Sequence, residues 1–396
     1  MMKPEDFIAE KVRIMPFSGI RKFFDIASEM EGVISLGVGE PDFDTPWAIR
    51  EKGIYNLEKG KTVYSSNAGM IELRKEINNY LKRTIGCSYC PNNEIIVTVG
   101  ASESIDLALR AVINDGDEVL VPEPSYVSYK PCVTMADGVP VIVNTKAENS
   151  FKLTVDDIKD KITDKTKALI LPYPNNPTGA IMEKEDIESL AEFLKDKDIL
   201  IISDEIYSEL TYGDKKHVSI AAIDYMRDKT IVINGFSKSY AMTGWRLGYA
   251  AGPKEIISAM TKVHQYCIMC APTTSQQAAI EALRSCDNSV AAMRKEYDRR
   301  RRFMRKGFLD MGLDCYEAQG AFYLFPCIKS TGLSSDEFCE RLLFEEKVAV
   351  VPGTAFGECG EGFIRCSYAY SVEEIRVALG KIADFVKKVK AEKEGI

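Results

Sequence analysis

Histidine is scarce in this sequence: His217 and His264 are the only two among 396 residues. A Ser-His-Asp or Cys-His mechanism therefore has little material to work with. Long apolar runs are also missing, since no stretch reaches the ~18–20 consecutive apolar residues that a membrane-spanning helix needs. The first residues, MMKPEDFIAEKVR, lack the apolar core of a signal peptide. We therefore expect a cytoplasmic protein with no membrane partner.

Positive charge is in deficit, with 51 Lys and Arg against 59 Asp and Glu and a net charge of -8. A nucleic-acid surface needs a basic patch that neutralises phosphates, so we expect no nucleic-acid partner. One basic run, DRRRRF, contains Arg299–Arg302. This run is more typical of a solvated helix face than of an anion site.

Eleven cysteines, an odd number in a long chain, favour reduced thiols over a disulfide framework. Two Cys-x-x-Cys pairs, Cys87/Cys90 and Cys267/Cys270, together contain the four thiolates that a zinc site needs. The pairs lie far apart in the sequence, and neither has the context of a zinc ribbon. We therefore expect structural cysteines and no metal.

Short apolar runs alternate with amphipathic helical patterns along the chain, without an internal repeat. Apolar strands followed by such helices predict a mostly parallel sheet covered on both faces. The runs are EIIVTV, EVLVPEP, VPVIVNT, KALILPYP, DILIISDE, KTIVINGF and GYAAGP. We predict an α/β fold with a large doubly wound domain over residues 46–280 and a smaller α+β domain from residues 1–45 and 281–396. The segment FSGIRKFFDIASEM is expected to pack against the smaller domain.

Polar residues stand at the ends of several predicted strands. They are Gly100–Glu103, Asn175–Asn176, Asp204 with Tyr207, and Ser237–Lys238. Ligands in open α/β sheets bind outside the carboxyl ends of the strands, so we expect these residues to converge on one edge of the sheet.

Each of these groups has a chemical use. The turn GASES offers the free N–H groups of a helix start to a phosphate, although Ser102 alone is typical of an N-cap. Asp204 is either a cap or ion-pair partner, or the partner of a cationic ring nitrogen. Burial and the nearby Arg246 lower the pKa of Lys238 and free its amine as a nucleophile, whereas an ion pair explains this lysine alone. A P-loop is excluded, because FSKS has no glycine before its lysine.

One ligand accounts for the whole set. Pyridoxal 5′-phosphate carries a phosphate, a ring nitrogen that accepts electrons when protonated, a phenolate oxygen and an aldehyde that condenses with lysine. The sequence therefore predicts pyridoxal 5′-phosphate as the cofactor.

The sequence resembles the class I aminotransferases, the aspartate/aromatic aminotransferase family of fold type I. The motifs that carry the resemblance extend over nearly the whole chain and occur in the order of that family. They are ISLGVGEPDFDTP, YSSNAGMIELR, PNNPTGA, SDEIY, SKSYAMTGWRLGY and FIRCSYA.

The resemblance implies a role for each matching residue at the cofactor. Lys238 is expected to hold the cofactor aldehyde, Asp204 the ring nitrogen, and Tyr207 and Asn176 the phenolate oxygen. Tyr126 matches the aromatic residue that stacks on the ring. The residues implied at the phosphate are Ser237, Arg246, Ala101 and Ser102, together with Tyr64 of a neighbouring subunit. A homodimer with shared active sites is thus expected.

The substrate side of the site is implied in the same way. Arg365 matches the arginine that binds the substrate α-carboxylate through bidentate hydrogen bonds. Gly39 and Asn176 match residues of the substrate pocket. Two departures stand out. Tyr173 replaces the usual first asparagine of the PNNPTGA region, and HQYCIMCAPTTSQQ contains no arginine for a substrate side-chain carboxylate. Strict aspartate specificity is therefore not predicted.

The expected activity is that of an aminotransferase acting on an amino acid and a 2-oxo acid by a ping-pong mechanism through pyridoxamine phosphate. Aspartate and aromatic amino acids are the expected donors, with 2-oxoglutarate as acceptor. One alternative is a carbon–sulfur β-lyase on the same fold, because motifs at the cofactor do not decide the fate of the substrate side chain. A more remote alternative is a non-catalytic ligand-sensing regulator, which needs a DNA-binding module that the sequence does not indicate.

Overall fold

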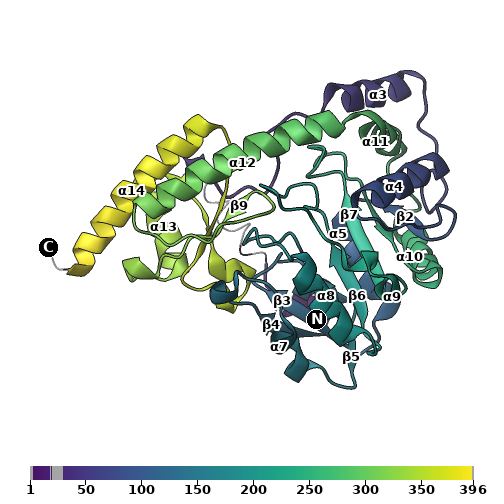
Figure 1. The fold of residues 1–396 in the computed structure, drawn as a ribbon, viewed down its shortest axis with the longest axis horizontal. Helices are drawn as coiled ribbons and strands as arrows, with labels where there is room; N and C mark the ends of the chain where they lie inside the picture. Colours follow the sequence, from purple (N-terminus) through teal and green to yellow (C-terminus); the bar gives the residue numbers. More distant parts are fainter. Residues whose placement is uncertain (1–2, 18, 20–29, 395–396) are drawn as a thin grey trace.

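A seven-stranded sheet forms the centre of the larger part of the molecule in this computed structural model, which describes residues 3–17, 19 and 30–394 (Figure 1). The strand order is β2-β8-β7-β6-β5-β3-β4. The strands are β2 (Ile95–Thr98), β3 (Glu118–Glu123), β4 (Val139–Asn144), β5 (Thr166–Leu171), β6 (Leu200–Asp204), β7 (Thr230–Gly235) and β8 (Gly248–Ala251). β8 runs opposite to the other six described strands of this sheet, so the predicted mostly parallel α/β fold is confirmed.

Helices cover both faces of this sheet. They are α4 (Ile71–Thr84), α5 (Ala101–Val112), α6 (Tyr129–Met135), α7 (Val155–Ile158), α8 (Lys184–Leu194), α9 (Asp224–Arg227), α10 (Lys254–Cys267) and α11 (Thr273–Ser285), and α3 (Trp47–Glu58) packs on α11. Successive residues of a strand point to opposite faces, and β6 shows the consequence. Ile202 packs in the core with Ile105 of α5 and Ile257 of α10, whereas Ile201 packs with Leu190 of α8. Both faces are apolar for this reason.

Within the described residues, the smaller part combines two short sheets with three α-helices. Its elements are β1 (Ile34–Ser35), α12 (Asp287–Asp310), β9 (Tyr323–Leu324), α13 (Ser335–Glu346), β10 (Val348–Ala349), β11 (Val351–Pro352), β12 (Ile364–Ser367) and α14 (Val372–Glu394). β1 pairs in parallel with β10, which joins an early segment to the C-terminal part of the chain. α12 extends from the larger part along α14 of the smaller part (Figure 1). The division at residues 46 and 281 remains a proposal; its second boundary falls inside α11.

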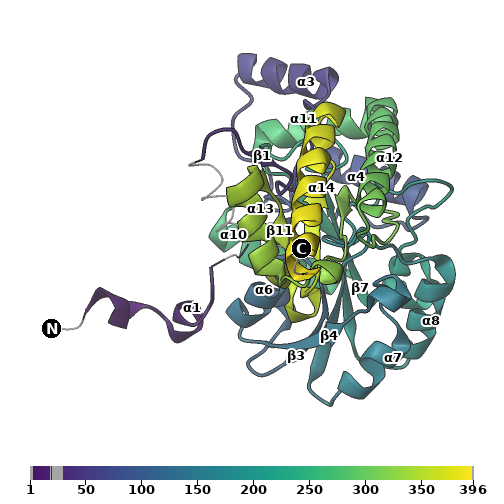
Figure 2. The same ribbon diagram turned by 90° about the vertical axis from the view of Figure 1, so that its left-hand side faces the viewer.

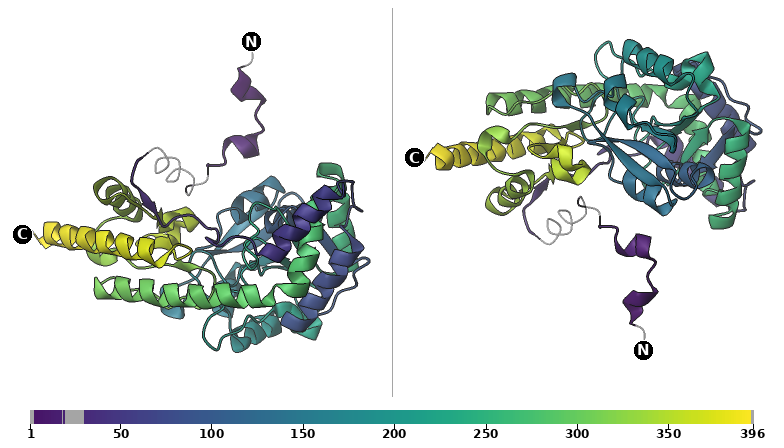
Figure 3. Two further views of the ribbon diagram at one scale, coloured as in Figure 1. Left: turned by 90° about the horizontal axis from the view of Figure 1, so that it is seen from above. Right: turned by 90° about the horizontal axis from the view of Figure 1, so that it is seen from below.

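The N-terminal residues project away from the rest of the chain (Figures 2 and 3). They contain the short helix α1 (Glu10–Arg13), whose Lys11 amine donates to Oδ1 of Asp137 at 2.7 Å and to the carbonyl oxygen of Met135 at 3.1 Å. The segment FSGIRKFFDIASEM was expected to pack against the smaller domain, but residues 18 and 20–29 lie outside the described residues. Among the described helices, none has the length and apolar character needed to cross a bilayer.

The basic run in α12 is only half solvated, so the predicted solvated face is wrong for two of its residues. Arg299 and Arg302 are largely exposed, whereas Arg300 and Arg301 are only 7% and 6% exposed. Arg301 donates to Oδ1 of Asp298 and to the carbonyl oxygen of Ala318, both at 2.8 Å. Successive helical residues are about 100° apart, so four of them cannot share one face.

Candidate active site

A cavity of about 450 Å³ lies at the carboxyl-end edge of the large sheet, where the sequence places its polar strand ends. Its wall contains every predicted site residue except Tyr64. These residues are Gly39, Ala101, Ser102, Tyr126, Asn176, Asp204, Tyr207, Ser237, Lys238, Arg246 and Arg365. Tyr64 is outside the cavity wall and 78% exposed. Because the structure contains one chain, the expected contact of Tyr64 with a neighbouring subunit stays a prediction.

Asp204 ends β6 and its side chain is buried. The hydroxyl of Tyr129 donates to Oδ2 at 2.7 Å, and the backbone N–H of Ile206 donates to Oδ1 at 3.2 Å. Burial raises the pKa of Asp204 to about 6, although both hydrogen bonds favour the ionised form. The site thus holds a carboxylate that a cationic partner would keep ionised.

Lys238 follows β7 and points into the same cavity. Removal of its amine from water lowers the pKa of Lys238 to about 8; Arg365 and Arg246 act in the same direction, and Glu40 opposes them. The sequence predicts this direction from burial and from Arg246. Nζ donates a hydrogen bond to the carbonyl oxygen of Gly39. A lysine with this pKa is substantially neutral, and therefore nucleophilic, in mildly alkaline solution.

The start of α5 forms a cradle of donors. Gly100 precedes the helix with a φ of +79°, and among the described residues no side chain caps the helix start. A Cβ on Gly100 would lie 2.8 Å from Nη2 of Arg246. The hydroxyls of Ser102 and Ser237 line the same wall. Uncapped N–H groups, a guanidinium and hydroxyls together suit a phosphate group.

Arg365 lies in β12 with a side chain that is almost fully buried. Nη1 donates to Oδ1 of Asn176 at 3.0 Å, and Nη2 donates to the carbonyl oxygen of Gly37. Its guanidinium carbon lies 4.5 Å from the ring centre of Tyr323. Nε has no hydrogen-bond partner among the described residues. A buried guanidinium with an unused donor beside a cavity suits a carboxylate ligand.

Two tyrosines of the site were missed at the sequence level. The hydroxyl of Tyr129 donates to Asp204, and the hydroxyl oxygens of Tyr323 and Tyr207 lie 2.9 Å apart. No helical spacing points to Tyr129, because α6 begins at this residue and Tyr126 lies in the loop before it. No local pattern points to Tyr323, which comes from β9 in the smaller part.

The residues present fit pyridoxal 5′-phosphate. The cavity contains a phosphate cradle, an amine of lowered pKa, a buried carboxylate and the aromatic ring of Tyr126. It also contains the phenol of Tyr207 and the carboxamide of Asn176, which are donors for a phenolate oxygen. Among the described residues, no group of three or more His, Cys, Asp or Glu side chains is arranged to hold a metal ion.

Comparison with known proteins points to one family. The family model described as aminotransferase class I and II matches residues 31–382. Aspartate aminotransferase of Pyrococcus abyssi is 48% identical, over 97% of this chain and 99% of that protein. Aromatic-amino-acid aminotransferase 2 of Thermococcus litoralis is 45% identical over the same shares. The crystal structure of an aromatic aminotransferase from Pyrococcus horikoshii superposes with a TM-score of 0.89 at 46% identity, covering 92% of this chain and 99% of that chain.

Proposed function

This chain belongs to the aminotransferase class I and II family, and from that premise we propose that it transfers amino groups by a ping-pong mechanism between aspartate or aromatic amino acids and 2-oxoglutarate. The protein is an aminotransferase that depends on pyridoxal 5′-phosphate. In a ping-pong mechanism the first product, a 2-oxo acid, leaves before the acceptor 2-oxo acid binds.

One observation carries the proposal: Lys238 and Arg365 face the same cavity. The amine of Lys238 is able to act as a nucleophile and as a base, because its pKa is lowered to about 8. The guanidinium of Arg365 offers a fixed, desolvated site for the α-carboxylate that every amino acid and 2-oxo acid shares. An amino acid held by its carboxylate at Arg365 would present its α-carbon to Lys238.

The cofactor-binding roles are proposed residue by residue. The amine of Lys238 holds the aldehyde, the carboxylate of Asp204 holds a proton at the ring nitrogen, and Tyr126 stacks on the ring. The phenol of Tyr207 and the amide of Asn176 donate to the phenolate oxygen. Asn176 is suited to this because its Oδ1 already accepts from Arg365 while its amide N–H groups remain available. The proposed phosphate donors are Ala101, Ser102, Ser237 and Arg246.

The bound cofactor supplies an electron sink for the substrate α-carbon. Lys238 would take the proton from the substrate α-carbon as a general base and would give it up again as a general acid. Asp204 would keep the ring nitrogen of the bound cofactor protonated, because a buried negative charge favours a cationic partner. Gly39, which lies against the Tyr323 hydroxyl, leaves room for the substrate in the cavity.

The cavity wall supports a mixed range of donors. Tyr126, Tyr129 and Tyr323 give it an aromatic lining, which suits aromatic side chains. Its lysine and arginine residues are Lys238, Arg246 and Arg365, all of which have other proposed partners. An aspartate side chain would therefore bind without a dedicated cation from the described part of this chain. The two relatives named above carry aspartate and aromatic activities in their names.

A homodimer with shared active sites is part of the proposal. Several large apolar side chains are exposed, and a partner subunit would bury those that fall within its interface. They include Phe17, Trp47, Tyr64 and Tyr266, which are 59–101% exposed. In the dimer, Tyr64 would reach the phosphate site of the other subunit. All eleven cysteines are free, which supports the proposed cytoplasmic location.

The proposal is tested by mixing the cofactor-loaded protein with single amino acids, without any 2-oxo acid, and following the absorbance of the bound cofactor. We expect one turnover, with the aldehyde absorbance lost and one equivalent of 2-oxo acid released, for aspartate and for aromatic amino acids. Adding 2-oxoglutarate should restore the absorbance. Sustained release of 2-oxo acid and ammonia would instead assign a β-lyase, and no absorbance change with any donor would overturn the proposal.

A further inference from the structure

Residues 37–45, here called the strap, cross the cavity and contact its two substrate-facing cations. The carbonyl oxygen of Gly37 accepts from Arg365, and that of Gly39 accepts from Lys238. Val38, Gly39 and Glu40 also line the cavity wall. The backbone of the strap therefore borders the space that the substrate has to occupy.

Contacts between the strap and the reactive residues change during catalysis. Lys238 gives up its hydrogen bond to Gly39 when its amine is used, and Arg365 shares its donors with the substrate carboxylate. The two ends of the strap have other contacts, because the backbone N–H of Val38 donates to the hydroxyl of Tyr370 at 3.2 Å and the hydroxyl of Thr45 donates to the carbonyl oxygen of Ala241 at 2.6 Å. The stretch between these ends needs its own anchor, one that does not take part in the reaction.

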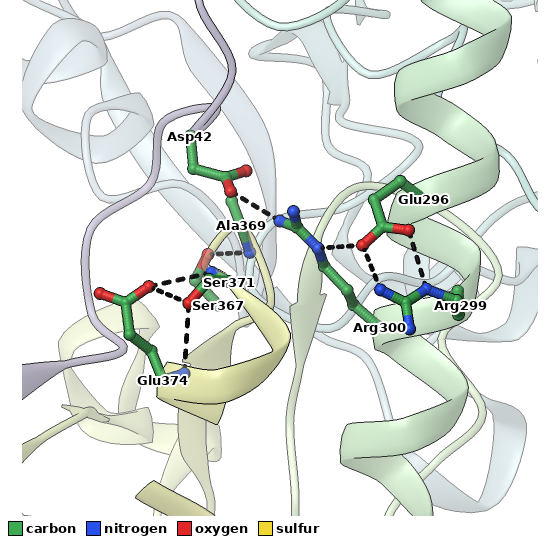
Figure 4. A network of polar contacts seen from close by, with 8 residues as sticks. All are labelled: Asp42, Glu296, Arg299, Arg300, Ser367, Ala369, Ser371 and Glu374. Atoms are coloured by element: carbon green, nitrogen blue, oxygen red, sulfur yellow. Dashed lines mark hydrogen bonds and ion pairs between the residues drawn. The ribbon is translucent and has the colours of Figure 1, made fainter. Parts of the chain in front are cut away.

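Arg300 of α12 provides such an anchor (Figure 4). Nη1 of Arg300 donates to Oδ2 of Asp42 at 2.7 Å, three residues beyond Gly39. The guanidinium carbon also lies 5.2 Å from the ring centre of Phe43, the next residue of the strap. The ring of Phe43 in turn packs edge-on against Tyr297 of α12, with ring centres 5.2 Å apart. Two adjacent strap residues are thus fixed to one helix.

The Arg300 side chain is itself fixed before it reaches the strap. It is buried, with 8% of the side chain exposed, and Nε donates to Oε1 of Glu296 at 2.9 Å. Hydrogen bonds from Arg299 and Arg300 hold the pKa of Glu296 at about 2, so this carboxylate stays ionised. One edge of the guanidinium is therefore tied to α12, and the other edge is directed at Asp42 (Figure 4).

We propose that the Arg300–Asp42 ion pair is a positioning pair. It keeps the backbone of the strap at the distance from Lys238 and Arg365 that substrate binding requires. The proposal rests on the proposed aminotransferase function and extends it to residues that touch neither cofactor nor substrate. It also gives a role to half of a basic run whose sequence alone suggested a solvated surface.

Asp42→Asn is the main test, because Asp42 is partly exposed and the change leaves the Arg300–Glu296 contact in place. Loss of a charge-assisted hydrogen bond should raise the KM for the amino donor about tenfold, with kcat changed less than about threefold. Asp42→Glu keeps the carboxylate and should recover most of the KM. Arg300→Lys keeps the charge but cannot bridge both carboxylates, so it should resemble Asp42→Asn.

Arg299→Gln is the matched control. Arg299 is the neighbouring arginine and donates to the same Glu296 through two bonds of 2.8 Å, but no contact joins it to Asp42. This variant should keep the KM and kcat of the wild type. An equal rise in KM in Arg299→Gln and Asp42→Asn would overturn the proposal, as would an unchanged KM in Asp42→Asn.

A second readout needs no activity. In the cofactor-free protein, backbone N–H groups of residues 37–45 should exchange with deuterium faster in Asp42→Asn than in the wild type or in Arg299→Gln. Unchanged exchange there would contradict the anchoring role. Failure of the proposed function looks different: the wild type itself would transaminate no donor, while the exchange result would still stand.

Discussion

The hydroxyl of Tyr129 donates a 2.7 Å hydrogen bond to Oδ2 of Asp204, joining the first residue of α6 to the last residue of β6. Asp204 is otherwise a carboxylate that burial pushes towards its protonated form, with a pKa raised to about 6. The phenol favours the ionised form, because it donates to the negative charge. Tyr129 therefore supports the charge on which the proposed role of Asp204 depends.

Tyr129→Phe should lower kcat without unfolding the protein. A hydrogen bond to a charged group is worth about 1.5–3 kcal/mol, which corresponds to a roughly ten- to hundredfold loss if it is fully expressed in the transition state. The loss should be largest at the acid end of a kcat profile measured between pH 6 and 9, since the pKa of Asp204 rises further without the phenol.

Tyr80→Phe is the control for this change. Tyr80 is equally buried and donates to Oε1 of Glu209 at the same 2.7 Å, but it does not line the cavity. Its kcat should stay at the wild-type value over the whole pH range. A flat ratio of wild-type to Tyr129→Phe activity from pH 6 to 9 would contradict the argument.

Asp204→Asn should have opposite effects on rate and on stability. A buried ring-nitrogen cation left unpaired costs ~3–5 kcal/mol, so kcat should fall by roughly two to four decades. In the cofactor-free protein the raised pKa of Asp204 means that its contribution to stability is complete below the unfolded value of 3.8 and is lost as the pH rises through about 6. The side chain of the asparagine variant does not ionise, so this variant does not lose that stability as the pH rises.

Urea unfolding of the cofactor-free protein at two pH values measures the effect. At pH 7 the free energy of unfolding of Asp204→Asn should exceed that of the wild type by about 3 kcal/mol, at 1.36 kcal/mol per pKa unit. At pH 4 the two proteins should differ much less. A less stable variant at pH 7 would show that Asp204 supports the fold rather than the cofactor.

Lys238 should capture the cofactor with a pH dependence set by its own environment. Its pKa is lowered from 10.5 to about 8, so the nucleophilic neutral amine appears as the pH rises through 8. The rate of covalent cofactor capture, followed by absorbance after mixing with the cofactor-free protein, should rise with a midpoint near pH 8. Lys238→Arg should capture none at any pH, and a wild-type midpoint near 10.5 would contradict the prediction.

The strand ends of the site could be predicted from sequence because the carboxyl ends of neighbouring parallel strands meet at one edge by geometry alone. Asp204 and Lys238 come from β6 and β7, which are neighbours in the sheet, so their convergence follows once the strands are recognised. Tyr323 could not be found in this way, since its position depends on how the smaller part packs over the cavity. The burial of Arg300 was not predicted for a related reason. Arg299 and Arg300 are identical in the sequence, and only the packing of α12 makes one exposed and the other buried.

Gly100→Ala should weaken cofactor binding through Arg246. The methyl group would lie 2.8 Å from Nη2 of Arg246, so the guanidinium has to move away from the start of α5. Loss of one charge-assisted contact with the phosphate should raise the cofactor Kd roughly ten- to hundredfold. The φ of +79° adds about 1–2 kcal/mol of backbone strain, which a control has to separate from the loss of the contact.

Gly116→Ala supplies that control. Gly116 has a φ of +81°, and no described atom lies within 4 Å of the position where its Cβ would be, so its substitution introduces the same strain without touching Arg246. Both variants should lose similar stability in urea unfolding of the cofactor-free protein, but only Gly100→Ala should lose affinity for the cofactor in an equilibrium titration. Equal Kd values for the two variants would mean that backbone strain alone acts, and that Arg246 does not hold the phosphate.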